Sequence, residues 1–158
     1  MAADSDAKRV EEAKTLSKTE PAKAEGTYKE ILNKGPGQSD AAVRDYENAL
    51  VGLGELYRDH RQTDELSQLV ETTRTVLSSF AKAKTAKLVR QLLDLFTTIP
   101  NTLDIQINVT KSCIDWAIQK RLGFLRQSLE TRLVSLYMQK QSYYEALTLI
   151  NTLLKELK

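Results

Sequence analysis

An apolar repeat of 3.6 residues runs along most of this chain and is widest in residues 124–158. Apolar side chains recur there at helical spacing on two successive segments: Leu125, Leu129, Leu133, Leu136 and Tyr137 on the first, and Ala146, Leu147, Ile150, Leu153, Leu154 and Leu157 on the second. Such a stripe is too wide for one partner helix to cover, so each helix needs neighbours on two sides. A helix hairpin that cannot bury itself alone is the unit of a stacked repeat. The pattern therefore predicts a scaffold made of repeated helix pairs.

The same periodicity predicts about eight helices and no strand. Only six glycines and three prolines interrupt the chain, and the strongest breaks are Gly35-Pro36-Gly37 and Ile99-Pro100-Asn101. We expect an all-α fold, a right-handed solenoid of antiparallel helix pairs that forms one domain over residues 1–158. Its expected parts are a weak first pair over 5–34 and further pairs over about 39–79, 82–121 and 124–157.

Two segments that lie 80 residues apart repeat one spacing. Leu53-Gly54, Tyr57 and Leu66 stand at the same offsets as Leu133-Val134, Tyr137 and Ala146. A leucine and a small residue, a tyrosine, and a small or apolar residue nine positions later resemble the tetratricopeptide pattern. In that pattern an aromatic ring on the first helix fills the space beside a small residue on the second. The spacing predicts a helical repeat and, more loosely, this type of repeat.

Charge and composition argue against several kinds of partner. The formal net charge of +2 is too small for a nucleic-acid binder defined by its bulk charge, and no window is apolar over the 18 or more residues of a membrane span. We therefore expect neither nucleic acid nor membrane as a partner. The single cysteine excludes an internal disulfide and fits a reducing compartment. No secretory signal is recognisable at the start, MAADSDAK.

The residues that could carry chemistry are few. One histidine and one cysteine make a zinc site or Cys-His catalysis improbable. His60 falls in a charged turn, and Cys113 falls on the apolar side of its helix beside Trp116, as a buried structural thiol does. Gly52-Leu53-Gly54 lies in a helical pattern without a preceding strand, which favours close helix packing over phosphate binding. We predict no enzyme, and no catalytic, cofactor, metal or small-molecule site.

One charged cluster stands out in AKAKTAKLVR, residues 81–90. Its members are Lys82, Lys84, Lys87 and Arg90, and three-residue spacing puts Lys84 near Lys87 and Lys87 near Arg90. The simpler interpretation is an ordinary solvated helix face. The alternative is a patch that docks an acidic surface of a partner protein, where charge complementarity gives orientation and association rate. These four residues are the candidate partner-binding site.

Several segments resemble a known family. AKAKTAKLVRQLLDLF (81–96), CIDWA (113–117) and FLRQSLETRLVSLY followed by EALTLINTLLKELK are similar to the N-terminal half of the non-ATPase subunit eleven family of the proteasome regulatory-particle lid. Members of this PCI family are helical solenoids that end in a PCI (winged-helix) module. The resemblance is specific over 81–158, recognisable over 50–80 and poor over 1–40. No segment corresponds to the PCI module, so we expect a piece of a longer protein, cut between repeats.

The resemblance implies a non-catalytic structural subunit. In the family the N-terminal solenoid reaches the α-subunits of the proteasome core particle and helps to clamp the regulatory particle to them, which supports ubiquitin-dependent degradation. The rest of the full-length protein meets the ATPase ring and other lid subunits. A cytoplasmic and nuclear location is expected. The alternative is a tetratricopeptide-type adaptor that binds an extended peptide in its concave groove. Arg90, Arg126 and Arg132 could contribute to such a groove.

Overall fold

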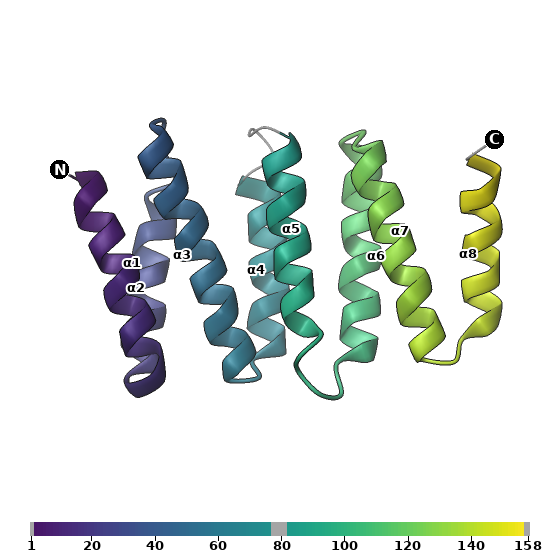
Figure 1. The fold of residues 1–158 in the computed structure, drawn as a ribbon, viewed down its shortest axis with the longest axis horizontal. Helices are drawn as coiled ribbons and strands as arrows, with labels where there is room; N and C mark the ends of the chain where they lie inside the picture. The colour runs from purple at the N-terminus through teal and green to yellow at the C-terminus, as the bar shows by residue number, and fades with distance from the viewer. Residues whose placement is uncertain (1, 77–81, 157–158) are drawn as a thin grey trace.

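The fold is a row of helices, each antiparallel to the next. A computed structural model describes residues 2–76 and 82–156, with side chains over 6–76 and 84–156, and within these residues it contains helices and loops and no strand (Figure 1). The helices are α1 (Ala2–Thr19), α2 (Pro21–Asn33), α3 (Asp40–Asp59), α4 (Thr63–Val76), α5 (Lys82–Phe96), α6 (Leu103–Gln119), α7 (Gly123–Gln139) and α8 (Tyr143–Glu156). The predicted all-α class and about eight helices are confirmed. The right-handed twist stays a prediction.

The helices pack in the order in which they occur in the chain. α1 lies against α2 and α3, and α3 lies against α2, α4 and α5. The second half is a close group, since α7 packs along both α6 and α8, whereas α6 touches α4 and α5 over much smaller areas. Each helix thus depends on its immediate neighbours, as in a solenoid.

Helix α3 holds the first half of the molecule together. Ser39 caps its N-terminus, because the serine hydroxyl accepts a hydrogen bond of 3.1 Å from the backbone N–H of Ala42. The buried positions of α3 lie on more than one face: Asp45, Tyr46, Ala49, Leu50, Gly52, Leu53, Gly54, Leu56 and Tyr57. The helix is therefore covered from several sides.

The two glycines of α3 allow this close packing. A Cβ atom at residue 52 would lie 2.7 Å from Cζ of Tyr28 on α2, and a Cβ at residue 54 would lie 2.8 Å from methyl groups of Leu92 and Leu95 on α5. Both distances are shorter than any ordinary carbon contact. The prediction that Gly52 and Gly54 serve helix packing is confirmed.

Three of the turns between helices share one hydrogen-bonding pattern. After α3, the N–H of Arg61 donates to the carbonyl of Arg58, and the N–H of Gln62 donates to the carbonyl of Tyr57, with Arg61 at φ 56°. This is the Schellman arrangement, in which a residue in the left-handed region ends the helix. The same bonds recur around Arg121 (φ 57°) and around Gln141 (φ 65°). Arg61 and Gln141 are 80 residues apart, so the repeat seen in the sequence extends to the backbone of the turns.

The buried face of α6 differs from the one that the sequence indicated. The i, i+4, i+8, i+11 spacing of Ile105, Val109, Cys113 and Trp116 predicts that these four form the core side, but only Cys113 is fully buried and the other three are half-buried. The interior positions of this helix are Ile107, Thr110, Cys113, Ile114 and Ala117. The reason is that α6 is apolar on two faces and packs mainly along α7. Ile105 and Val109 are turned toward α4, where contact is sparse.

Gly52→Ala should destabilise the fold. Alanine favours a helix over glycine by about 1 kcal/mol, but overpacking against the fully buried ring of Tyr28 costs about 1–3 kcal/mol. We expect a net loss of up to about 2 kcal/mol in the free energy of unfolding, measured by urea denaturation. Gly26→Ala is the matched control, because nothing lies within 4 Å of that Cβ, and it should stabilise. Equal effects at the two positions would contradict the close-packing account.

Arg121→Gly should stabilise the fold. A non-glycine residue in the left-handed region costs about 1–2 kcal/mol, and glycine adds unfolded-state entropy of about half that. A gain of about 0.5–1 kcal/mol is therefore expected in the same denaturation experiment. Gln119→Gly, two residues earlier in the last turn of α6, should instead lose about 1 kcal/mol. A loss at residue 121 as well would show that its left-handed conformation is not a source of strain.

Candidate protein-interaction surfaces

The basic cluster lies at the start of α5 and is partly joined to α3. Nζ of Lys84 is 4.0 Å from a carboxylate oxygen of Glu47, and Lys84 itself is exposed. Lys87 is exposed and Arg90 is half-buried. Lys82 is the first residue of α5, but its side chain lies outside the described residues. The described members thus form a short exposed basic stripe with one acidic neighbour, Glu47, and its role in partner binding stays a prediction.

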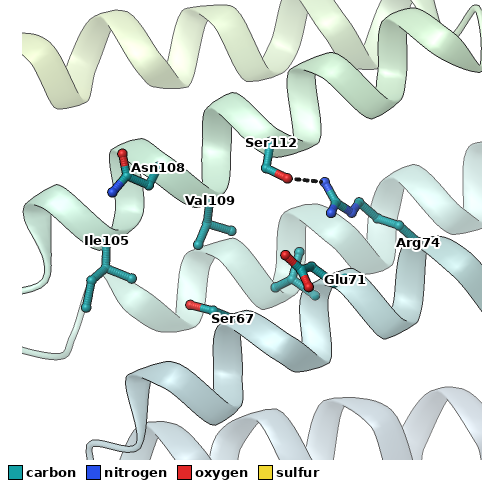
Figure 2. A pocket seen from close by; sticks show the side chains of 8 residues that line it. Ser67, Glu71, Arg74, Ile105, Asn108, Val109 and Ser112 are labelled. Atoms are coloured by element: carbon teal, nitrogen blue, oxygen red, sulfur yellow. Dashed lines mark hydrogen bonds between the residues drawn. The ribbon is translucent and has the colours of Figure 1, made fainter.

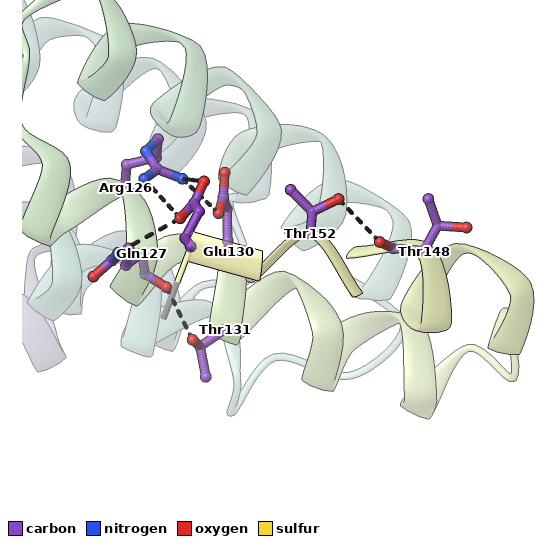
Figure 3. Close-up of polar contacts among 7 residues, drawn as sticks. Arg126, Gln127, Glu130, Thr131, Thr148 and Thr152 are labelled. Atoms are coloured by element: carbon purple, nitrogen blue, oxygen red, sulfur yellow. Dashed lines mark hydrogen bonds and ion pairs between the residues drawn. The ribbon is translucent and has the colours of Figure 1, made fainter. Parts of the chain in front are cut away.

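Two of the three arginines considered for a peptide groove are engaged within the chain. Arg126 forms a bidentate pair with Glu156, at 3.0 and 2.9 Å, and donates to the buried Glu130 at 2.9 Å (Figure 3). These hydrogen bonds raise the pKa of Arg126 and lower the pKa of Glu156. They also tie the start of α7 to the last turn of α8. Arg132 donates to Asp94 of α5 at 2.5 Å. Partners within the fold therefore compete with any peptide for these two side chains.

The single cysteine and the single histidine lie in different settings. Cys113 is fully buried, and burial raises the pKa of its thiol to about 11, against a smaller opposing effect of Arg74. His60 is exposed at the end of α3, with Nε2 3.4 Å from the carbonyl oxygen of Ser17. The predictions of a buried structural thiol and a surface histidine are confirmed. Among the described residues, no group of three or more His, Cys, Asp and Glu side chains could hold a metal ion.

The outer side of α8 is apolar and uncovered. Tyr143 and Leu147 are each 57% exposed and Leu154 is 53% exposed, and four- and seven-residue steps put them on one side of the helix. Only Ala146 is fully buried on α8. The prediction of an uncovered face near the end is thus confirmed for Leu154. Leu153 is half-buried, and Leu157 lies outside the described residues. None of the described helices has the length and apolar character to cross a membrane.

A hollow of about 280 Å³ separates α4 from α6. One side of each helix lines it: Ser67, Val70, Glu71 and Arg74 from α4, and Ile105, Asn108, Val109 and Ser112 from α6 (Figure 2). Sequence reasoning missed it, because the spacing of Ile105 and Val109 predicts core residues and nothing in the sequence singles out Arg74. The available signal was the apolar pattern on a second face of α6.

This architecture defines a class of protein. Antiparallel helices stacked in a row, each relying on its neighbours, form a helical-repeat protein whose extended faces suit protein–protein binding. Arg126 and Arg132 hold helices together, and the single thiol is buried with a raised pKa.

The chain belongs to a particular family of this class. The sequence model described as the 26S proteasome regulatory subunit RPN6 N-terminal domain matches residues 6–140. The chain is 46% identical over 136 residues to a probable 26S proteasome regulatory subunit rpn6 of Schizosaccharomyces pombe. The aligned residues make up 86% of the chain and 32% of that relative. It is 42% identical over 128 residues to a probable subunit rpn-6.1 of Caenorhabditis elegans, with 80% and 29% covered. It is 33% identical over 160 residues to subunit RPN6 of Saccharomyces cerevisiae, with 95% and 37% covered. The chain thus spans about a third of the length of these relatives, and the resemblance read from the sequence is confirmed.

Cys113 should resist modification in the folded chain. Thiolate is the reactive form, and a buried thiol with a pKa of about 11 is almost wholly protonated at about pH 8. Reaction with a disulfide reagent at that pH should be slow and should become fast in denaturing urea. The slow rate should fall further in a variant that stabilises the whole fold. Rapid modification without denaturant would contradict the burial of Cys113.

Proposed function

We propose that the chain is a non-catalytic structural arm of the proteasome lid that helps to clamp the regulatory particle to the α-ring of the core particle. In this role it supports ubiquitin-dependent protein degradation in the cytoplasm and the nucleus. The observation that carries the proposal is the match of residues 6–140 to the RPN6 N-terminal domain, together with relatives that are all named as proteasome regulatory subunits. The longer protein would also meet the ATPase ring and other lid subunits.

The shape and chemistry of the chain are suited to such an arm. In a row of helices the two ends are connected through many small interfaces, because every helix contacts its neighbours in the chain. Ion pairs such as Arg132–Asp94 and Arg126–Glu156 cross from one helix to another and fix their relative positions. The exposed basic stripe on α5 offers a surface for acidic groups of a partner.

Charge reversal on α5 should weaken binding to the core particle. The double variant Lys84→Glu, Lys87→Glu places two acids on the exposed stripe, so attraction becomes repulsion. We expect several-fold weaker retention of purified core particle in a pull-down at low ionic strength, and a smaller difference at high salt. The matched control is Lys120→Glu, Lys155→Glu, which changes the net charge equally at exposed positions away from α5.

The outcomes distinguish two statements: that the chain binds the core particle, and that the basic stripe on α5 makes the contact. If the parent chain retains no core particle even at low salt, the clamp is wrong. If both double variants weaken binding equally, binding depends on the net charge of the chain, and the α5 stripe is not a specific contact with the core particle. A chain that ignores core particle but saturates with short acidic C-terminal peptides would instead favour the peptide adaptor.

A further inference from the structure

The groove between α4 and α6 contains a positive charge that lacks a carboxylate partner. Arg74 is half-buried, its Nη1 donates to the neutral hydroxyl of Ser112 at 3.0 Å, and its Nε is buried without an acceptor (Figure 2). Glu71 also lines the groove, but no ion pair within 4.0 Å joins its carboxylate to Arg74 among the described residues. Buried charges are costly unless they are paired, so this arrangement is incomplete as it stands.

Four other arginines of the described residues have such partners. Arg9, Arg58, Arg126 and Arg132 each contact a carboxylate: Glu30, Asp59, Glu156 and Asp94, respectively. The Arg126 pair shows the usual geometry, with both oxygens of one carboxylate bound by the guanidinium fork. Arg74 has the same fork, and its Nε edge is the part left unused. A carboxylate supplied from outside the chain would complete it.

The rest of the groove is suited to a polypeptide. Ile105 and Val109 give it an apolar, half-buried floor, while Asn108 and Ser67 offer amide and hydroxyl groups that can bind peptide N–H and C=O groups. The lining residues span seven residue-to-residue steps on each helix, which corresponds to about 10 Å along the axis. About three residues of an extended chain have that length. Figure 2 shows the polar pair Arg74–Ser112 at one end of this path and Ile105 at the other.

We propose that the α4–α6 groove binds a short extended segment of a partner protein that carries an acidic side chain, with its carboxylate on the fork of Arg74 and an adjacent apolar residue over Ile105 and Val109. A side-chain carboxylate fits better than a terminal carboxylate, because Nε of Arg74 lies below the surface. The guanidinium must turn outward to bind, and the flexible side chain of a bound glutamate or aspartate can follow it. The exposed Glu71 at the rim disfavours segments with several acids, so a single acid flanked by apolar residues is the best match. This site goes beyond the proposed clamp and does not depend on it.

The test is titration of the 158-residue chain, labelled with ¹⁵N, by three capped tripeptides. The first is acetyl-Leu-Glu-Val-amide, the second replaces Glu by Gln, and the third has Gln and a free terminal carboxylate. The readout is the Nε–H resonance of Arg74, assigned by its loss in Arg74→Lys. We expect it to shift and saturate with the Glu peptide and to require roughly tenfold more of the Gln peptide, because a charge-assisted pair is lost. The Nε–H of Arg126, whose fork already holds Glu156, should not move.

Variants keep the outcome decisive. Arg74→Met should weaken binding of the Glu peptide roughly tenfold, and Arg74→Lys should also weaken it, since lysine keeps the charge but lacks the fork. Arg58→Met is the matched control and should bind as the parent does; circular dichroism verifies that each variant is folded. Equal binding of the Glu and Gln peptides, unchanged binding by Arg74→Lys, or a common shift of all arginines would overturn the proposal. Binding of the free-terminus peptide alone would overturn the assignment to a side-chain carboxylate. These results involve no core particle, so failure here and failure of the clamp are separate findings.

Discussion

The close approach of three helices at two glycines is the contact on which the first half of the solenoid depends. Tyr28 of α2 lies over Gly52, and Leu92 and Leu95 of α5 lie over Gly54, so one helix, α3, is contacted from both directions along the row. Any larger side chain would push a neighbour away and change the angle at which the next helix is added. In a row of helices an angular error of this kind is carried to every later repeat. Small residues in α3 therefore set the path of the whole row.

The helices of this fold could be predicted from the sequence, because their signals are local. A 3.6-residue apolar period, the break at Gly35-Pro36-Gly37 and the stop at Pro100 each act within a few residues, and the helices begin and end near the expected positions. The rotation of α6 could not be predicted in this way. That helix is apolar on two faces, and only the tertiary packing against α7 decides which face is buried. The α4–α6 groove is the consequence of that choice, so it was invisible to local patterns.

The arginines show that local sequence patterns also fail to predict which charged side chains are paired. In the sequence Arg74, Arg126 and Arg132 look alike, as single cations on helices with acids nearby. In the fold Arg126 meets Glu156, which is 30 residues away, and Arg132 meets Asp94, which is 38 residues away, while Arg74 meets a serine. Whether a cation is free for a partner thus depends on contacts between distant segments. The basic stripe on α5 was found only because its members are close together in the sequence.

The α4–α6 groove lies where neighbouring helices pack less extensively than elsewhere in the row. In a solenoid the stability is approximately a sum of the stabilities of the repeats and of their nearest-neighbour interfaces. The interfaces of α3 and of α7 are extensive, whereas α6 is joined to α4 by sparse contact that includes the Arg74–Ser112 hydrogen bond. A segment that contacts Arg74 on one side and Val109 on the other adds apolar contact and charge pairing to one of the two sparsest interfaces of the described row. A ligand that bound beside α3 would contact helices that already pack extensively against each other. A ligand at α4–α6 therefore has the greater effect on how the two halves of the arm are held together.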